Sequence, residues 1–125
     1  MKHLAAAIGL ALVATPASAV PGDMSIATFL AKADALRAKG PLALLSSDIK
    51  LLKTEGMAAG QAYRAQLVRE RAQGKPSSCP PKGTRIDSDQ LIGHLRSYPA
   101  AARPGTPMRT AIADFFIKTF PCPQG

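Results

Sequence analysis

The amino-acid sequence predicts an all-α fold, a small single-domain bundle of about four helices stapled by one disulfide. Apolar residues recur at spacings of three and four inside segments that begin near Ser, Thr or Asp and end at Gly or Pro. No segment shows the sustained alternation of apolar and polar residues that is typical of a strand. A chain of 125 residues with 46% apolar side chains is long enough for one small domain.

The first 19 residues are typical of a secretory signal peptide. Lys2 precedes an apolar run over residues 4–13, and the small residues Ala17, Ser18 and Ala19 follow. A bilayer-spanning helix needs about 20 apolar residues, so a permanent transmembrane segment is the weaker interpretation. We therefore expect a signal peptide over residues 1–19, a mature all-α domain over residues 20–125, no transmembrane segment, and localisation in the periplasm.

Two helices are predicted before residue 74. Ser25 is a suitable N-cap for the first helix, which Gly40 and Pro41 end before a short turn over residues 41–45. A long second helix is predicted from Asp48 to about Gln73. Its apolar or small positions recur with the helical period: Ile49, Leu52, Gly56, Ala59, Tyr63 and Leu67.

Two glycines lie inside this long helix, at positions 56 and 60. Each costs about 1 kcal/mol relative to Ala in a helix interior. Two interpretations are open. Another backbone approaches the helix closely at Gly56 and Gly60, or an Ala- and Gly-rich helix simply bends there.

Two shorter helices are predicted after the Gly- and Pro-rich loop over residues 74–86. Asp87 and Gln90 form a capping box, with Ile86 and Leu91 placed for a hydrophobic staple, and this helix closes near residues 98–99. For the last helix we expect Thr106 as N-cap and Pro107 as first helical residue. Its apolar face is expected to comprise Met108, Ala111, Ile112, Phe115 and Thr119, broadened by Phe116 and Phe120.

Both cysteines, Cys79 and Cys122, remain after the expected cleavage. In an oxidising compartment an even and minimal pair most simply forms one disulfide. The spacing is not Cys-x-x-Cys, and two thiols with one distant His do not make a tetrahedral zinc set. The predicted bridge closes a loop of about 44 residues, which on the chain-entropy model contributes on the order of 4 kcal/mol.

The sequence shows no set of catalytic residues. His94 is the only His after residue 19, and it lies two helical turns beyond Asp87. A catalytic base needs a nucleophile within hydrogen-bond reach and an orienting partner, and neither is indicated. The acidic residues are scattered singly, and no hydrolase, phosphate-binding or calcium-binding motif occurs. We therefore expect no enzyme, no catalytic residue, no metal and no cofactor, but a binding protein.

Basic residues outnumber acidic ones. Removing residues 1–19 takes away one of 16 basic and none of 8 acidic side chains, which leaves a formal net charge of +7. Arg64, Arg71 and Lys75 are spaced to share one face at the end of the long helix, with Arg69 and Lys82 nearby. Such a cluster is either a solvated helix face or an electrostatic binding surface for an acidic partner. Nucleic acid is not expected, because the protein is exported and aromatic residues are not interleaved with the basic ones.

The chain from Ser78 onward resembles the Tai family, periplasmic immunity proteins that neutralise cell-wall amidase effectors of type VI secretion systems. The resemblance is carried by Ser78-Cys79-Pro80, by a capped helix with Asp89-Gln90-Leu91-Ile92 and Leu95, by Tyr98-Pro99, and by the closing Phe120-Pro121-Cys122-Pro123. It covers about 45 residues, somewhat more than a third of the chain.

This resemblance implies an all-α periplasmic protein, often a homodimer, that inhibits a peptidoglycan amidase by occluding its active site. Inhibition of this kind needs a complementary surface and no catalytic residue. The alternative function is a periplasmic envelope protein that binds anionic wall or lipid components through the basic face formed by Arg64, Arg71 and Lys75.

Overall fold

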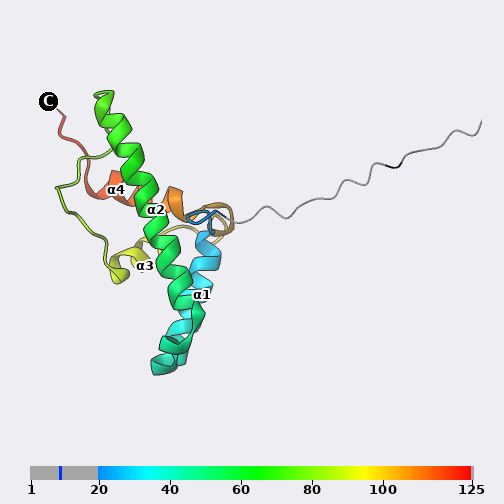
Figure 1. Cartoon of the computed structure of the whole chain (residues 1–125). Coiled ribbons are helices and arrows are strands. Elements are labelled where there is room, and N and C mark those ends of the chain that lie inside the picture. The colour runs from blue at the N-terminus through cyan, green and yellow to red at the C-terminus, as the bar shows by residue number, and fades with distance from the viewer. Residues whose placement is uncertain (1–8, 10–19, 125) are drawn as a thin grey trace, which may run out of the picture.

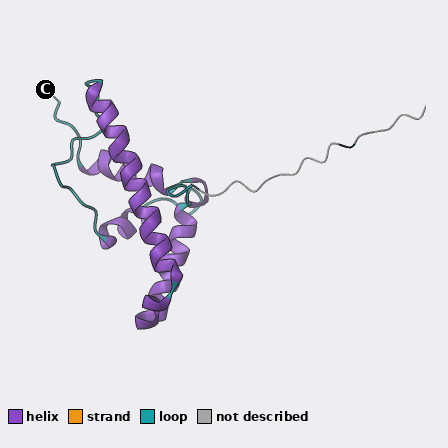
Figure 2. Ribbon diagram, viewed as in Figure 1, coloured by secondary structure: helices purple, strands orange, loops and turns teal. Residues whose placement is uncertain are grey.

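The computed structural model describes Gly9 and residues 20–124. Within this part lie four α-helices, and no strand is found there (Figure 2), so the all-α prediction is confirmed. The predicted signal peptide falls, apart from Gly9, outside the described residues and stays a prediction. The elements are α1 (Ile26–Lys39), α2 (Ser47–Ala72), α3 (Ser88–Arg96) and α4 (Met108–Thr119), with two 3-10 helices, η1 (Gly40–Leu45) and η2 (Arg103–Gly105).

The long helix α2 is the element on which the others assemble. Figure 1 shows α1 beside the first half of α2. Both α3 and α4 pack on α1, and they also pack on each other. The most extensive packing is that of α4 against α2, and α1 also packs on α2. The short η1 reverses the chain between α1 and α2, so these two helices form an antiparallel pair.

Local capping explains where three of the helices begin. The Ser25 hydroxyl accepts a hydrogen bond from the Thr28 N–H at the start of α1, and Ser46 caps α2 in a similar way through the Asp48 N–H. The predicted capping box is confirmed: the Asp87 carboxylate accepts from the Gln90 N–H at 2.8 Å, and the Gln90 side chain accepts from the Asp87 N–H at 3.1 Å. Each cap satisfies amides that have no partner inside the helix.

The capping box gives a direct test of α3. Asp87→Ala should lower the free energy of unfolding by about 0.5 to 2 kcal/mol, because it leaves an amide of the first turn without its acceptor. Asp89→Ala is the matched control, since Asp89 is an exposed acidic residue in the same turn and makes no cap. Urea unfolding of both variants measures the difference. Equal stability of the two would show that the cap contributes nothing.

The predicted start of the last helix is wrong by one residue. Pro107 is the N-cap rather than the first helical residue, and Thr106 does not cap α4. The Thr106 hydroxyl donates instead to the Ala102 carbonyl at 2.8 Å, and the Thr106 carbonyl accepts from the Ile26 N–H at 2.8 Å. Thr106 and Pro107 are therefore extended and pair with the segment that enters α1, where Ser25 and Pro107 form an isolated bridge.

One core joins all four α-helices, and it is almost entirely aliphatic and aromatic. Thr119 does not belong to it, contrary to prediction, because its position on α4 is exposed. Phe116 is central, since its ring stacks on the Tyr63 ring with centroids 5.1 Å apart. The buried apolar residues are Ile26, Phe29, Leu30, Ala59, Tyr63, Leu67, Leu95, Met108, Ala111, Ile112, Phe115 and Phe116.

The predicted disulfide is confirmed. Cys79 and Cys122 are bonded, with their Cα atoms 4.9 Å apart. The Cys79 N–H also donates to the Phe120 carbonyl at 2.8 Å, and the buried Ser78 hydroxyl is hydrogen-bonded to the Tyr63 hydroxyl. The loop after α2 is thereby fixed both to the end of α4 and to the middle of α2.

Candidate functional site

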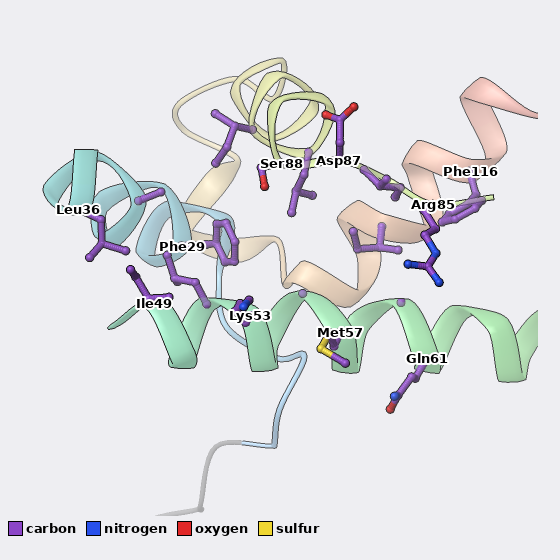
Figure 3. A pocket seen from close by; sticks show the side chains of 18 of the residues that line it. Phe29, Leu36, Ile49, Lys53, Met57, Gln61, Arg85, Asp87, Ser88 and Phe116 are labelled. Carbon is purple, nitrogen blue, oxygen red and sulfur yellow. The ribbon is translucent and has the colours of Figure 1, made fainter. Parts of the chain in front are cut away.

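A groove lies between α2 on one side and α1 and α3 on the other. Its volume is about 730 Å³. Figure 3 shows Lys53, Met57 and Gln61 along α2, with side chains from α1 and from the start of α3 across from them. We call it the α2 groove. Its lining residues are Phe29, Ala33, Leu36, Ile49, Leu52, Lys53, Gly56, Met57, Gly60, Gln61, Arg64, Arg85, Ile86, Asp87, Ser88, Leu91, Ile92, Ile112 and Phe116.

Gly56 and Gly60 keep this groove open. Apart from the nearby backbone of α2 itself, a Cβ atom added at either position would meet no described atom within 4 Å. Of the two interpretations left open, the close approach of another backbone at these glycines does not hold for the described chain. Such an approach does occur elsewhere on α2: a Cβ at Gly22 would lie 3.4 Å from the Ala59 nitrogen, and Gly22 has a positive φ of 98°.

The open space beside Gly60 leads to a prediction for the stability of the fold. Gly60→Ala should raise the free energy of unfolding by up to about 1 kcal/mol, because Ala has the higher helix propensity and the added methyl meets no clash. Gly74→Ala is the contrasting variant, since Gly74 has a φ of 72° that Ala adopts only with strain. Thermal unfolding should show the first variant stabilised and the second destabilised. A destabilised Gly60→Ala would contradict the open geometry of the groove.

A second hollow continues beyond the groove toward the end of α2. It has a volume of about 690 Å³ and shares Arg64, Arg85 and Phe116 with the α2 groove. Arg71 and Lys82 also line it, and its lining includes no Asp or Glu. We call it the basic hollow.

Two of the three residues of the predicted basic face line one concavity, and the third does not. Arg64 and Arg71 both line the basic hollow, but Lys75 lines neither concavity. Lys75 lies beyond Ala72, where α2 ends, so the helical spacing that would place it with Arg64 and Arg71 no longer applies. Lys82 and Arg85, which come from the loop before α3, take its place.

His94 has partners that the sequence analysis missed. Its Nε2 lies 2.7 Å from the Ala111 carbonyl oxygen, which can only accept, so this nitrogen carries the proton and donates. The Tyr98 hydroxyl lies 3.4 Å from the same nitrogen and donates to the Asp114 carboxylate at 2.5 Å. The spacing of four between His94 and Tyr98 is a weak signal for this cluster, and nothing local indicates Asp114.

The hydrogen bonds of His94 and Tyr98 link α3 and the residues just after it to α4. The Nε2 nitrogen donates its proton to the Ala111 carbonyl and thereby fixes the His94 ring of α3 against α4. No Ser, Thr or Cys side chain in the described chain is hydrogen-bonded to the His94 ring. Burial and the hydrogen bond to Asp114 raise the pKa of Tyr98, which keeps its hydroxyl protonated as a donor.

Two further carboxylates hold chain segments in place. Hydrogen bonds from the Gln66 side chain and from Ser77 hold the pKa of Glu70 below its usual value. Their contribution to stability is therefore present above the usual pKa of Glu and is lost as the pH falls through the lowered value. Glu55 is buried in α2, and its carboxylate accepts from the Gly22 N–H at 2.7 Å and the Met24 N–H at 3.3 Å.

The described residues contain neither a membrane-spanning helix nor a cluster of metal ligands. None of their helices combines the length and apolar character that are needed to cross a bilayer. No three His, Cys, Asp or Glu side chains among them lie close enough together to hold a metal ion.

Comparison with known proteins adds no relative. No protein-family model, no curated protein and no solved structure matches this chain. The resemblance of the C-terminal third to the Tai family therefore stays a prediction, and the function is inferred from the site.

Proposed function

We propose that this chain is an exported, non-catalytic binding protein that takes a protein partner in the α2 groove. The observation that carries the proposal is an open apolar groove along a helix whose two interior glycines have no internal packing partner. Each glycine lowers helix stability. A partner that packs over Gly56 and Gly60 would offset this cost.

Exposed apolar side chains favour a protein over a small molecule as the occupant. Met57 lines the groove with 64% of its surface exposed. At the end of the groove lined by Leu36 and Ile49, η1 connects α1 to α2 and exposes three leucines. Small-molecule sites enclose most of their ligand, whereas extended exposed apolar surface is typical of contacts with macromolecules. The η1 leucines are Leu42, Leu44 and Leu45, which are 68%, 81% and 85% exposed.

The class of partner follows from the resemblance to the Tai family. A periplasmic immunity protein would bind a peptidoglycan amidase effector and occlude its active site, and could do so as a homodimer. The disulfide is compatible with export to an oxidising compartment. The alternative, binding of anionic wall or lipid components, is supported by the cations of the basic hollow, but it leaves the apolar groove without an occupant.

Photo-crosslinking in exporting cells tests this proposal. A benzophenone amino acid placed at Met57 should give a protein adduct after illumination, and mass spectrometry identifies the partner. The matched control is the same amino acid at Ala65, which is exposed on α2 and lines neither concavity. Equal adducts at both positions, or none at Met57, would contradict protein binding in the groove. An amidase in the Met57 adduct would support the immunity role.

A further inference from the structure

The concave surface follows α2 for most of its length. The α2 residues that line the groove recur at spacings of three and four from Ile49 to Arg64, a distance of about 22 Å at 1.5 Å per residue. The same side of α2 continues into the basic hollow as far as Arg71, for a total of about 33 Å. The surface is thus a long track parallel to a helix.

Charge is distributed unevenly along this track. Asp87 is the only acidic residue that lines it, and its carboxylate is engaged in the cap of α3. The ion pairs of the described chain are Lys32–Asp48, Arg96–Asp34 and Arg109–Asp23, so none involves a cation of the track. Most of those cations gather at the Arg71 end. They are Lys53, Arg64, Arg71, Lys82 and Arg85.

We propose that the partner contributes an acidic amphipathic helix that lies along α2. Its apolar side covers Gly56 and Gly60, and its carboxylates face the cations of the basic hollow, Arg64 and Arg71 among them. This inference rests on the proposed function and specifies the segment that the groove accepts.

Helical structure in the partner follows from hydrogen bonding. An extended peptide binds well where a sheet edge offers free amides and carbonyls, and the described chain has no strand. The walls of the groove are helices, whose interior backbone groups are already paired. A helix needs no such partners, because it satisfies its own backbone.

Packing geometry also favours a helix. Two helices pack with their axes about 8 to 10 Å apart, and small residues at the contact allow the closer end of this range. Gly56 and Gly60 are one turn apart on α2 and project no side chain into the groove. They provide the flat contact that an approaching helix requires.

The register of crosslinks tests the helical part of the inference. The benzophenone amino acid is placed singly at Lys53, Met57 and Gln61 of the full chain in exporting cells, and the attachment sites on the partner are mapped. Lys53 and Gln61 are eight residues apart on α2, about 12 Å. Partner residues attached from these two positions should be about eight apart in a helix, but only about four apart in an extended peptide.

Arginine variants on α2 test whether the partner helix is acidic. Arg64→Gln combined with Arg71→Gln should lower the adduct yield at Met57 about fivefold, the effect of losing two exposed ion pairs. Arg69→Gln should leave the yield unchanged, because Arg69 is exposed on α2 and lines neither concavity. Equal yields from the two sets of variants would overturn an acidic partner.

The remaining outcomes separate this inference from the proposed function. Protein adducts with a spacing of about four would overturn the helix and leave protein binding intact. Lipid adducts at Met57, or flotation of the purified chain with phosphatidylglycerol vesicles that the Gly60→Leu variant abolishes, would overturn both. Absence of adducts at all three positions would also overturn both.

Discussion

Cys79→Ser should lower the free energy of unfolding by up to about 4 kcal/mol, the largest effect that we expect from a single substitution. The bridge joins residues 43 apart in sequence, and the loop that it closes contains α3 and α4. Without it, the unfolded chain gains the entropy of that loop. The folded state also loses the covalent link that holds the end of α4 beside the loop following α2.

Urea unfolding with and without a reducing agent measures this effect. Cys79→Ser, Cys122→Ser and the double variant should be equally destabilised, and reduction of the unmodified chain should reproduce the loss. The reducing agent should leave the double variant unchanged. A reduced chain that unfolds at the same urea concentration as the oxidised one would contradict a stabilising bridge.

Glu55→Ala should destabilise the fold by about 2 to 4 kcal/mol, because it removes a charged acceptor from two amides at a buried position. The Glu55 carboxylate binds the Gly22 and Met24 amides, and both residues also pair with α4. The Met108 N–H donates to the Met24 carbonyl at 2.8 Å, and the Arg109 N–H donates to the Gly22 carbonyl at 3.0 Å. Glu55 therefore holds this entry segment between α2 and the start of α4.

The isosteric variant Glu55→Gln provides the control. Both amides donate to the same carboxylate oxygen, and Gln keeps the volume and one acceptor oxygen at that place but not the carboxylate, so its loss of stability should be about half that of Glu55→Ala. Thermal unfolding ranks the two variants. In Glu55→Ala the Met24 amide should exchange its hydrogen faster, under conditions in which the rest of the chain stays folded. A Glu55→Ala variant as stable as the unmodified chain would show that the carboxylate does not anchor the segment.

Structural features that depend on residues close together in sequence, such as helix caps, could be predicted from the sequence. The N-caps Ser25 and Asp87 were predicted because a cap and its amide lie within three residues. The disulfide followed from cysteine count and compartment. Thr106 shows where local rules fail: its sequence context favours a cap, but Ile26, 80 residues earlier, pairs with its carbonyl and keeps it extended.

The candidate site was only partly predictable for the same reason. The spacing of Arg64 and Arg71 predicts that they share one side of α2, but the same spacing does not apply to Lys75, because α2 ends at Ala72. The α2 groove requires α1 and α3 to lie across from Gly56 and Gly60, and no local pattern specifies that arrangement. The role of Glu55 depends on amides more than 30 residues away.

The most direct measurement of the central claim, that the α2 groove binds a protein, is the Met57 crosslink in a Gly60→Leu background. Leucine at position 60 would project into the groove, and its Cβ meets no described atom within 4 Å outside the nearby backbone of α2. Ala65→Leu adds a similar side chain to α2 outside both concavities. We predict that Gly60→Leu leaves thermal stability at least unchanged and abolishes the protein adduct, whereas Ala65→Leu retains it. Equal adduct yields from the two folded variants would contradict binding in the groove.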